Sequence, residues 1–386
     1  MIDKKILIIF HDSQYQTDAY FASILLKQVQ ECGFQASAIN TSFDIPDTHI
    51  MYTIQQSNAD LVITIGLSGF EYQLLGDDLF YNALYCPIIH IIYRHPAYFT
   101  EHFNQRMNFT MDFLCPYPEY INYAQKYYER IPYVHLLPPL HIPDITNKPY
   151  YSRCIDIYFP SSYIPSDTII NQINELPKVF SLICNHIIEQ SILNPHTTIH
   201  KELANYMNSL SMEYSNEEFK ELMGYMQLVE LYVKMYYSEK YISFLIEEGY
   251  KVCVSGSNWN DFSKADCPNL TIIGSNGLTF SQTLNTMCDS KVVLNLQFHK
   301  NTGIHSRITS ALSCGSICIT NENTDIISTF NNNSSVLTFD SNSEDTLITH
   351  LNSVLATDYT HNICTNGLTD FTEYIREQAT SHFKNL

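Results

Sequence analysis

The stretch Lys291–Asn323 reads KVVLNLQFHKNTGIHSRITSALSCGSICITNEN, and the order of its elements decides the fold. It begins with an apolar run that ends at Leu296, which is typical of a buried parallel strand, and continues through a polar loop, His299–Arg307. Apolar side chains then recur at helical spacing over Ser306–Cys314, and a second apolar run, Ser316–Thr320, predicts another strand. A strand, a helix and a strand in this order form a parallel βαβ unit, so the stretch predicts an α/β fold.

The rest of the second half continues this alternation. Further strands are predicted at Cys154–Phe159, Tyr250–Ser255, Leu270–Ile273 and Ser335–Phe339, and helices at Thr279–Cys288 and Ser343–Ala356. Between the first two of these strands lies a mainly helical region, Asp167–Glu248, which is interrupted near Met212. Ser215 and Glu218 fit a capping box that restarts the helix there. The second half therefore predicts a Rossmann-like sheet with a helical insertion.

The first half shows a second series of the same kind. Its predicted strands are Ile6–Phe10, Phe34–Asn40, Asp60–Leu67 and Pro87–Tyr93, and its predicted helices are Thr17–Glu31, Asp47–Ser57, Phe70–Tyr85 and Glu119–Arg130. Gly33 stands where a helix end cap is expected. This alternation predicts a mainly parallel sheet with helices on both faces.

Length and proline content predict two domains. The chain has 386 residues, and a proline-rich segment, Leu137–Pro149, follows the first series as an interdomain linker. We expect an N-terminal domain over residues 1–150 and a C-terminal domain over residues 151–366, with its helical region at 167–248. Residues 367–386 carry apolar side chains at helical spacing and predict a closing helix that crosses between the domains. Ligands of open α/β sheets bind at the carboxyl ends of the strands. We expect these ends to face an interdomain cleft in this protein.

Composition narrows the class of protein. With 21 basic and 40 acidic residues, the net charge of −19 argues against a nucleic-acid or anionic-membrane surface. No apolar run is long enough to span a bilayer, and the N-terminus does not resemble a signal peptide. Eleven cysteines without a CxxC pair indicate a reducing compartment. We expect a soluble, cytoplasmic protein.

Three loops of the second half follow predicted strands and offer small or polar residues to a ligand. The candidate donor-binding residues in them are Gly256, Ser257, Asn258 and Trp259 in the first loop, Gly274 and Asn276 in the second, and Lys300, Asn301, Gly303, His305 and Arg307 in the third. The third loop leads into a helix, whose free N–H groups and positive dipole end favour an anion. Each loop alone also fits a simpler interpretation, in which glycines mark tight turns and basic side chains are solvated.

Taken together, these loops carry a family resemblance. This part of the chain resembles the donor-binding half of bacterial group-1 glycosyltransferases of the spore-maturation (CgeB-like) kind. The resemblance lies in the strand ending in Leu-Asn, the turn Gly303-Ile-His-Ser-Arg307, the following helix, and the small-x-Gly before a short strand. The segments IDIYFPSSY and PEYINYAQKYYERIPYVHLLPPL are similar to earlier parts of that family. The resemblance implies a GT-B fold, a nucleotide-sugar donor such as a UDP-, GDP- or dTDP-sugar on the C-terminal domain, and a protein or glycan acceptor on the N-terminal domain. It implies no further cofactor.

The chemistry of sugar transfer gives these residues roles. Lys300, Arg307 and the helix N-terminus would stabilise the departing diphosphate, so we expect no metal. The loop Gly256–Trp259 would line the nucleotide or phosphate, and Gly274 and Asn276 would flank the base. The family carries a Glu that accepts the ribose hydroxyls where this chain has Ser310, and a neutral hydrogen bond is weaker than a charge-assisted one. A non-catalytic GT-B subunit that binds a partner or glycan is therefore an alternative, as is an unrelated two-domain ligand-binding protein.

Acid–base candidates follow two strands of the first half. His11 and Asp12 come directly after the first predicted strand, and Arg94 and His95 directly after the fourth. A general base must reach the acceptor hydroxyl, and His11, Asp12 and His95 have suitable chemistry, with Arg94 on the acceptor side. The alternative is that these histidines cap strands or bond to the backbone.

Overall fold

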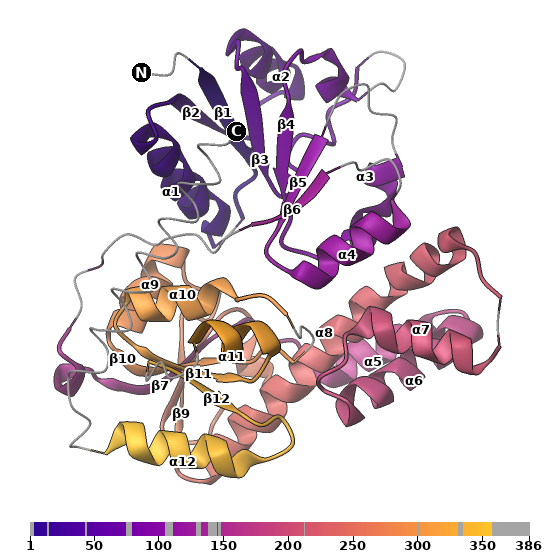
Figure 1. The fold of residues 1–386 in the computed structure, drawn as a ribbon. Helices are drawn as coiled ribbons and strands as arrows, with labels where there is room; N and C mark the ends of the chain where they lie inside the picture. Colours follow the sequence, from indigo (N-terminus) through magenta and orange to yellow (C-terminus); the bar gives the residue numbers. More distant parts are fainter. Residues whose placement is uncertain are drawn as a thin grey trace. The chain divides into compact units, whose positions relative to one another are not determined.

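The chain divides into two compact units, which are described separately. The computed structural model describes residues 4–13, 15–42, 45–74, 79–104, 111–128, 133–137, 145, 148–211, 213–298, 302–330 and 335–356. The described residues up to 137 belong to the first unit and those from 145 onward to the second (Figure 1). The closing helix predicted over 367–386 lies outside the described residues.

The first unit is built on a parallel six-stranded sheet in the order β2-β1-β3-β4-β5-β6. Its strands are β1 (Lys5–Phe10), β2 (Gln35–Asn40), β3 (Leu61–Ile65), β4 (Ile88–Ile91), β5 (Met111–Cys115) and β6 (Tyr133–Leu136). Its helices are α1 (Thr17–Glu31), α2 (Asp47–Gln56), α3 (Thr100–Asn104) and α4 (Pro118–Tyr127), with 3-10 turns η1 (Phe80–Ala83) and η2 (Pro96–Phe99). The strand order reverses beside β1, which makes its carboxyl end a topological switch point.

The helix predicted over Phe70–Tyr85 is wrong in the part that the structure describes. Only η1 forms there, and Gln73 pairs with Leu79 in an antiparallel bridge. The reason is a tertiary contact, because the Tyr81 hydroxyl donates to the carbonyl oxygen of Ser68. Gly69 makes room for the Tyr81 ring, since a Cβ at Gly69 would lie 2.1 Å from the Tyr81 hydroxyl oxygen. Long-range packing thus overrides helical periodicity in this segment.

The second unit holds another parallel six-stranded sheet, in the order β12-β11-β10-β7-β8-β9. Its strands are β7 (Ile155–Pro160), β8 (Val252–Ser255), β9 (Leu270–Ile273), β10 (Ser290–Asn295), β11 (Ile317–Asn321) and β12 (Val336–Phe339). Helices α9 (Phe280–Cys288), α10 (Ser306–Ser313), α11 (Thr324–Phe330) and α12 (Glu344–Leu355) alternate with or follow the later strands, and 3-10 turns η3 (Tyr150–Ser152) and η4 (Trp259–Asp261) join other elements. The order reverses between β7 and β10, which places a switch point at their carboxyl ends.

The predicted helical insertion is confirmed as four helices between β7 and β8. They are α5 (Ser166–Glu175), α6 (Lys178–Leu193), α7 (Ile199–Ser209) and α8 (Asn216–Glu247). The capping box of Ser215 and Glu218 starts α8 as predicted. Tyr237 and Tyr241 of α8 stack on Phe298 in the segment that follows β10, with ring centroids 3.8 and 5.3 Å apart. These stacked rings join the helical segment to the carboxyl edge of the sheet.

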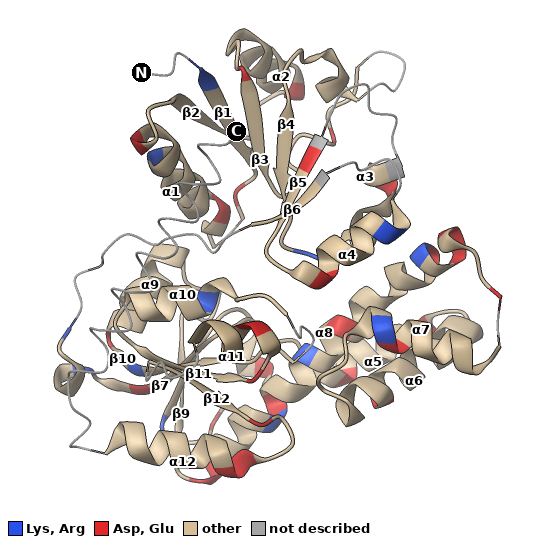
Figure 2. Cartoon of the chain, in the orientation of Figure 1, with Lys and Arg blue, Asp and Glu red and all other residues tan. Residues whose placement is uncertain are grey.

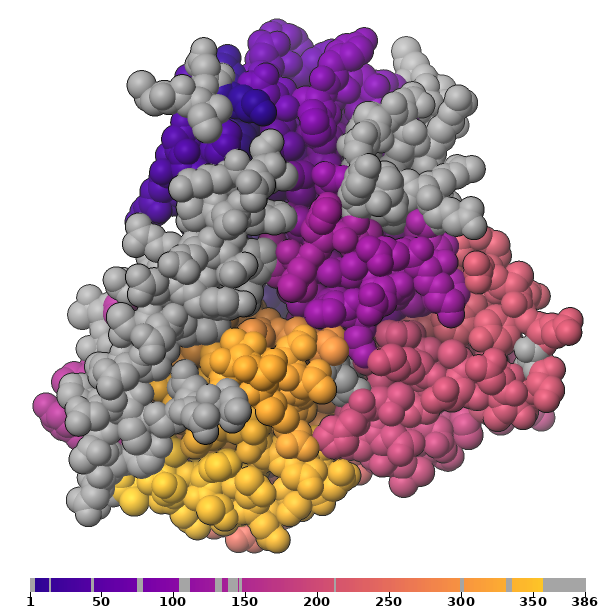
Figure 3. Space-filling view, viewed as in Figure 1, coloured from indigo at the N-terminus to yellow at the C-terminus, as the bar shows by residue number. Residues whose placement is uncertain are grey.

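Several different helices contribute to the surface of the second unit, and this surface carries few positively charged residues. In the space-filling view of Figure 3, α10 and α11 in orange lie beside α12 in yellow on one face. Figure 2 shows that the described Lys and Arg residues are scattered and form no continuous band in this view. Among the helices that the structure describes, none combines the length and hydropathy needed to cross a membrane.

Candidate functional site

Arg307 lies at the switch point of the second unit. It stands in the first turn of α10, and its Nη1 donates to Asn295 Oδ1 at 3.0 Å while its Nη2 donates to the Pro160 carbonyl oxygen at 2.7 Å. These acceptors end β10 and β7, the two strands between which the order reverses. Both acceptors are neutral oxygens, and these two hydrogen bonds fix the orientation of the guanidinium. The site therefore presents a fixed cation where an α/β sheet binds its ligand.

The loop before α10 is held by residues that follow β11. Gly303 donates its N–H to Asp325 Oδ2 at 2.5 Å, and its carbonyl accepts from Asn323 Nδ2 at 3.2 Å. His305 caps the helix, because its Nδ1 accepts from the Arg307 N–H at 3.0 Å. His305 thus has a structural role in addition to any contact with a ligand. The remaining predicted residues of this loop, Lys300 and Asn301, lie outside the described residues.

Gly256 permits a close approach between the loops that follow β7 and β8. Its φ is +131°, and a Cβ at this position would lie 2.6 Å from the backbone of Ser161 and Ser162. The Tyr163 N–H donates to the Ser257 carbonyl at 3.0 Å, which joins the two loops directly. Gly256 is therefore required by the backbone geometry of this edge.

We predict that Gly256→Ala lowers the free energy of unfolding by about 2 kcal/mol or more, because it combines backbone strain with a steric overlap. Urea unfolding of the variant and the wild type measures this difference. Gly224→Ala is the matched control, since Gly224 is an α8 glycine and no heavy atom lies within 4 Å of the place that an added Cβ would take. The free energy of unfolding of this control should rise by about 0.5–1 kcal/mol. Equal stabilities of Gly256→Ala and the wild type would contradict the close approach.

Trp259 is placed differently from the prediction. Its side chain is 0% exposed, its Nε1 donates to the Ser161 carbonyl at 2.5 Å, and its ring stacks on Tyr163. The Trp259 side chain therefore belongs to the core of the second unit and does not make the contact with the donor that the sequence predicts. Asn258 precedes it in the left-handed region, with a φ of +65°.

The loop after β9 adjoins the loop after β8. Asn276 and Ser257 pair in an isolated antiparallel bridge, and Gly274 has a φ of +60° beside the Leu278 side chain. Gly274 and Asn276 are both exposed. The structure therefore brings the first two predicted loops together at one edge of the second unit.

Two polar side chains, one in α10 and one in the segment after β10, are not placed as the sequence alone would suggest. Ser310 is buried and its Oγ donates to the Ser306 carbonyl at 2.8 Å, so the hydroxyl expected to contact ribose is turned toward its own helix. Gln297, which the sequence analysis missed, follows β10 and is 1% exposed. Both atoms of its amide lack a hydrogen-bond partner within the described part of the chain. An unsatisfied buried amide is costly, so Gln297 is a candidate for ligand contact, although a Gln between apolar residues offers little signal in the sequence.

The first unit brings three titratable side chains to the carboxyl end of β1. His11 is exposed and its Nδ1 lies 3.2 Å from Thr41 Oγ1, while Asp12 Oδ1 accepts from the Ala19 N–H at 3.3 Å in the first turn of α1. Asp18 belongs to the same turn, and burial, reinforced by the Asp12 charge and opposed by His11, raises the pKa of its carboxyl to about 6. Asp18 does not stand out in the sequence, because an acidic residue in a first helical turn is ordinary.

His95 does not qualify as the expected general base. It is 4% exposed, its Nδ1 accepts from the Ala97 N–H at 3.2 Å, and its ring packs against Tyr120 and Tyr123. His95 thus bonds to the backbone, as one of the alternative interpretations held, and this bond caps η2. Arg94 beside it is exposed, with its guanidinium carbon 5.7 Å from the centroid of the Tyr98 ring.

Comparisons with known proteins agree with the predicted fold. Residues 239–369, all in the second unit, match a family model described as glycosyl transferase-like. The crystal structure of T4 phage BGT in complex with its UDP-glucose substrate is similar with a TM-score of 0.56 and 13% identity, covering 99% of this chain and 98% of that chain. Sucrose-phosphate synthase from Thermosynechococcus elongatus has a TM-score of 0.49 and 9% identity over 99% and 98% of the two chains. No curated protein sequence matches the chain at a significant level. The two parallel sheets and the likeness to T4 phage BGT confirm the GT-B fold.

Proposed function

We propose that the protein is a glycosyltransferase that moves a sugar from a nucleotide-diphosphate donor to a hydroxyl of a protein or glycan acceptor. The preferred donor in this proposal is a UDP-sugar. The observation that carries the proposal is Arg307, whose guanidinium is oriented by Asn295 and Pro160 at the switch point between β7 and β10. The glycosyl transferase-like match over residues 239–369 supports the same class of reaction. So does the likeness to T4 phage BGT, whose structure contains UDP-glucose.

The second unit binds the donor in this proposal. Sugar transfer leaves a nucleoside diphosphate, whose developing charge the Arg307 guanidinium and the first N–H groups of α10 would stabilise. Lys300 and Asn301 would add to this site from the preceding loop. The exposed backbone at Gly274 and Asn276, together with Ser257, would contact the nucleotide. Arg307 supplies the positive charge that a metal supplies in other transferases, so this step is proposed to be metal-independent.

The first unit activates the acceptor in this proposal. Asp12 and Asp18 are a pair of carboxylates that interact electrostatically, with His11 acting on Asp18 as well. A carboxyl group with a pKa of about 6 is largely ionised at neutral pH while remaining a better base than an ordinary aspartate. The pair would take the proton of the acceptor hydroxyl as the sugar is transferred. Asp12, already named from the sequence, and Asp18 are therefore the proposed catalytic carboxylates.

The experiment that tests the proposal is a donor panel. The purified protein is incubated with UDP-, GDP- and dTDP-sugars, and the release of nucleoside diphosphate is followed by chromatography with and without candidate acceptors. We expect one nucleotide class to bind by calorimetry and to be hydrolysed slowly without an acceptor. Absence of both binding and turnover with every donor would contradict the proposal.

A second candidate function is a non-catalytic GT-B subunit that binds a nucleotide sugar or a glycan. Ser310 favours it, because its buried hydroxyl bonds to its own helix and leaves the ribose without the acidic partner that the resembled family uses. The same panel separates the two functions. A subunit of this kind would bind a donor or a glycan and release no nucleoside diphosphate.

A further inference from the structure

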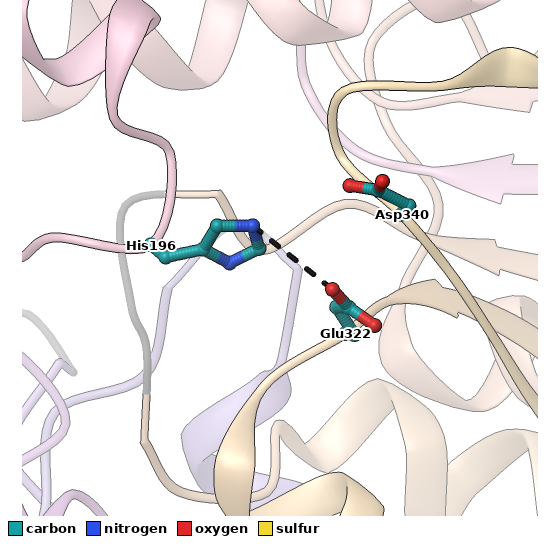
Figure 4. A group of neighbouring side chains, drawn as sticks. All are labelled: His196, Glu322 and Asp340. Atoms are coloured by element: carbon teal, nitrogen blue, oxygen red, sulfur yellow. Dashed lines mark ion pairs between the residues drawn. The ribbon is translucent and has the colours of Figure 1, made fainter.

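Three loops of the second unit bring an imidazole and two carboxyl groups together. His196 lies between α6 and α7, Glu322 directly follows β11, and Asp340 directly follows β12. Each offers one metal-ligating atom within 4.8 Å of the others, and His196 Nε2 lies 4.0 Å from Glu322 Oε1. Figure 4 shows the imidazole and both carboxyl groups turned toward a common space.

The sheet register fixes the two carboxyl groups as neighbours. Asn321 pairs with Phe339 at the end of β11 and β12, and the Glu322 N–H donates to the Phe339 carbonyl at 3.1 Å. Continuing the register by one residue places Glu322 beside Asp340. The Asn342 N–H donates to Asp340 Oδ1 at 2.9 Å, so one carboxyl oxygen is held by the backbone while the other is left for a ligand.

Among the described residues, few basic groups lie near the two carboxylates of this cluster. Elsewhere in the second unit, lysines pair with carboxylates, as Lys240 does with Glu344 at 2.7 Å and Lys291 with Asp156 at 2.6 Å. Within the described residues, the basic group within ion-pair distance of Glu322 is His196 alone. A neutral imidazole leaves the two carboxylates with two negative charges. A bound divalent cation would neutralise them.

Ser341 gives a separate indication of a polar ligand near the cluster. It directly follows Asp340, is 3% exposed, and its Oγ has no hydrogen-bond partner among the described residues. A buried hydroxyl without a partner is costly. A hydrated ion at the neighbouring carboxylates would bring polar groups to this part of the loop.

We propose that His196 Nε2, Glu322 and Asp340 bind a divalent transition-metal ion, with Zn²⁺ as the preferred ion. One imidazole with two carboxylates suits Zn²⁺ better than Mg²⁺ or Ca²⁺, which favour oxygen ligands throughout. Bonds of about 2.0–2.2 Å require ligand atoms about 3.4 Å apart, so the side chains close by about 1 Å on binding. The His196 and Glu322 side chains are 47% and 36% exposed, which leaves them free to make this movement.

The site would tie the helical segment to the sheet. His196 comes from the loop between two helices of the insertion, whereas Glu322 and Asp340 come from the carboxyl edge of the strands. Three protein ligands leave at least one coordination position for water or another ligand. Because a metal binds the folded site and not the separated loops, it should stabilise the second unit.

Calorimetry with Zn²⁺ alone, on full-length protein freed of metal with a chelator, tests the site without any nucleotide. We expect a stoichiometric Zn²⁺ site and a rise in Tm on Zn²⁺ addition. His196→Ala, Glu322→Gln and Asp340→Asn should each weaken binding by about tenfold or more. His49→Ala is the matched control, because His49 is an exposed histidine of α2 in the first unit, and it should bind Zn²⁺ as the wild type does.

Cobalt absorption spectra separate this site from the cysteines. Co²⁺ bound by nitrogen and oxygen ligands shows d–d bands without an intense thiolate charge-transfer band, and the bands should disappear in His196→Ala. Equal Zn²⁺ affinity of the wild type and a His196→Ala, Asp340→Asn double variant would overturn the proposal, as would a spectrum dominated by thiolate ligands. All variants are compared for Tm in chelator, so that loss of the fold is not read as loss of the site. Neither readout depends on sugar transfer, so failure of the metal site and failure of the proposed activity are distinguishable.

Discussion

Arg307→Ala should reduce affinity for the nucleoside diphosphate and lower kcat/KM by about 100-fold or more, because it removes a positioned charge from the leaving group. The guanidinium is held by Asn295 and Pro160 at the ends of β10 and β7, so the charge is oriented before the ligand binds. Calorimetry with UDP and steady-state kinetics with the best donor of the panel measure the two effects.

Arg307→Lys and Lys264→Ala complete the experiment. Lys keeps the charge but loses the forked donors, so its kcat/KM should fall between those of the wild type and Arg307→Ala. Lys264 pairs with Glu247 on the exposed surface, and its removal should leave nucleotide affinity unchanged. Circular dichroism and Tm must show that Arg307→Ala is folded. A folded Arg307→Ala protein with wild-type UDP affinity would show that the donor site has been placed wrongly.

Asp12→Asn should lower kcat by about 100-fold or more while leaving the donor KM nearly unchanged, because general-base catalysis acts on the acceptor and not on the nucleotide. Asp47→Asn is the control, since Asp47 is an exposed aspartate of the first unit, in the first turn of α2. Steady-state kinetics over a range of donor concentrations separates the two parameters. An unchanged kcat in Asp12→Asn would remove this residue from the mechanism.

The titration of the Asp18 carboxyl group should set the pH dependence of the same reaction. The raised pKa of about 6 means that the carboxyl group is protonated below pH 6, so kcat should fall as the pH drops through this value. The folded state disfavours the ionised form, so the contribution of Asp18 to stability is present at low pH and is lost as the pH rises through about 6.

Asp18→Asn should therefore stabilise the protein at pH 7.5 by about 1–2 kcal/mol, after allowance for partial solvent screening, and should also lower kcat. Urea unfolding at pH 5 and pH 7.5 checks the first effect, because the gain should shrink at the lower pH. Higher stability with full activity would assign Asp18 a purely structural role.

Much of the fold could be predicted because its determinants are local. The run KVVLN and the run SICIT predict strands since parallel strands buried on both faces read as continuous apolar segments, and both correspond to β10 and β11. The α8 capping box was equally readable, since Ser215 and Glu218 lie within one turn. Strands β5 and β6 were missed, because each is short and contains a polar residue, Asp112 in β5 and His135 in β6.

The candidate site was predictable in position but less so in its residues. Loops after parallel strands end at one edge of a sheet, so Gly256, Ser257, Gly274, Asn276 and Arg307 could be assigned to the carboxyl edge from their order alone. Their environments could not be assigned in this way. Burial depends on contacts distant in sequence.

By itself, the sequence determined two parallel sheets, the helical insertion and the loops in which polar chemistry gathers, because apolar periodicity and capping act over a few residues. Only the tertiary structure decided that Trp259 and His95 are buried, that Asp18 lies near Asp12, and that His196 meets Glu322 and Asp340. These outcomes depend on strand register and on long-range packing, which bring together side chains that no local pattern relates.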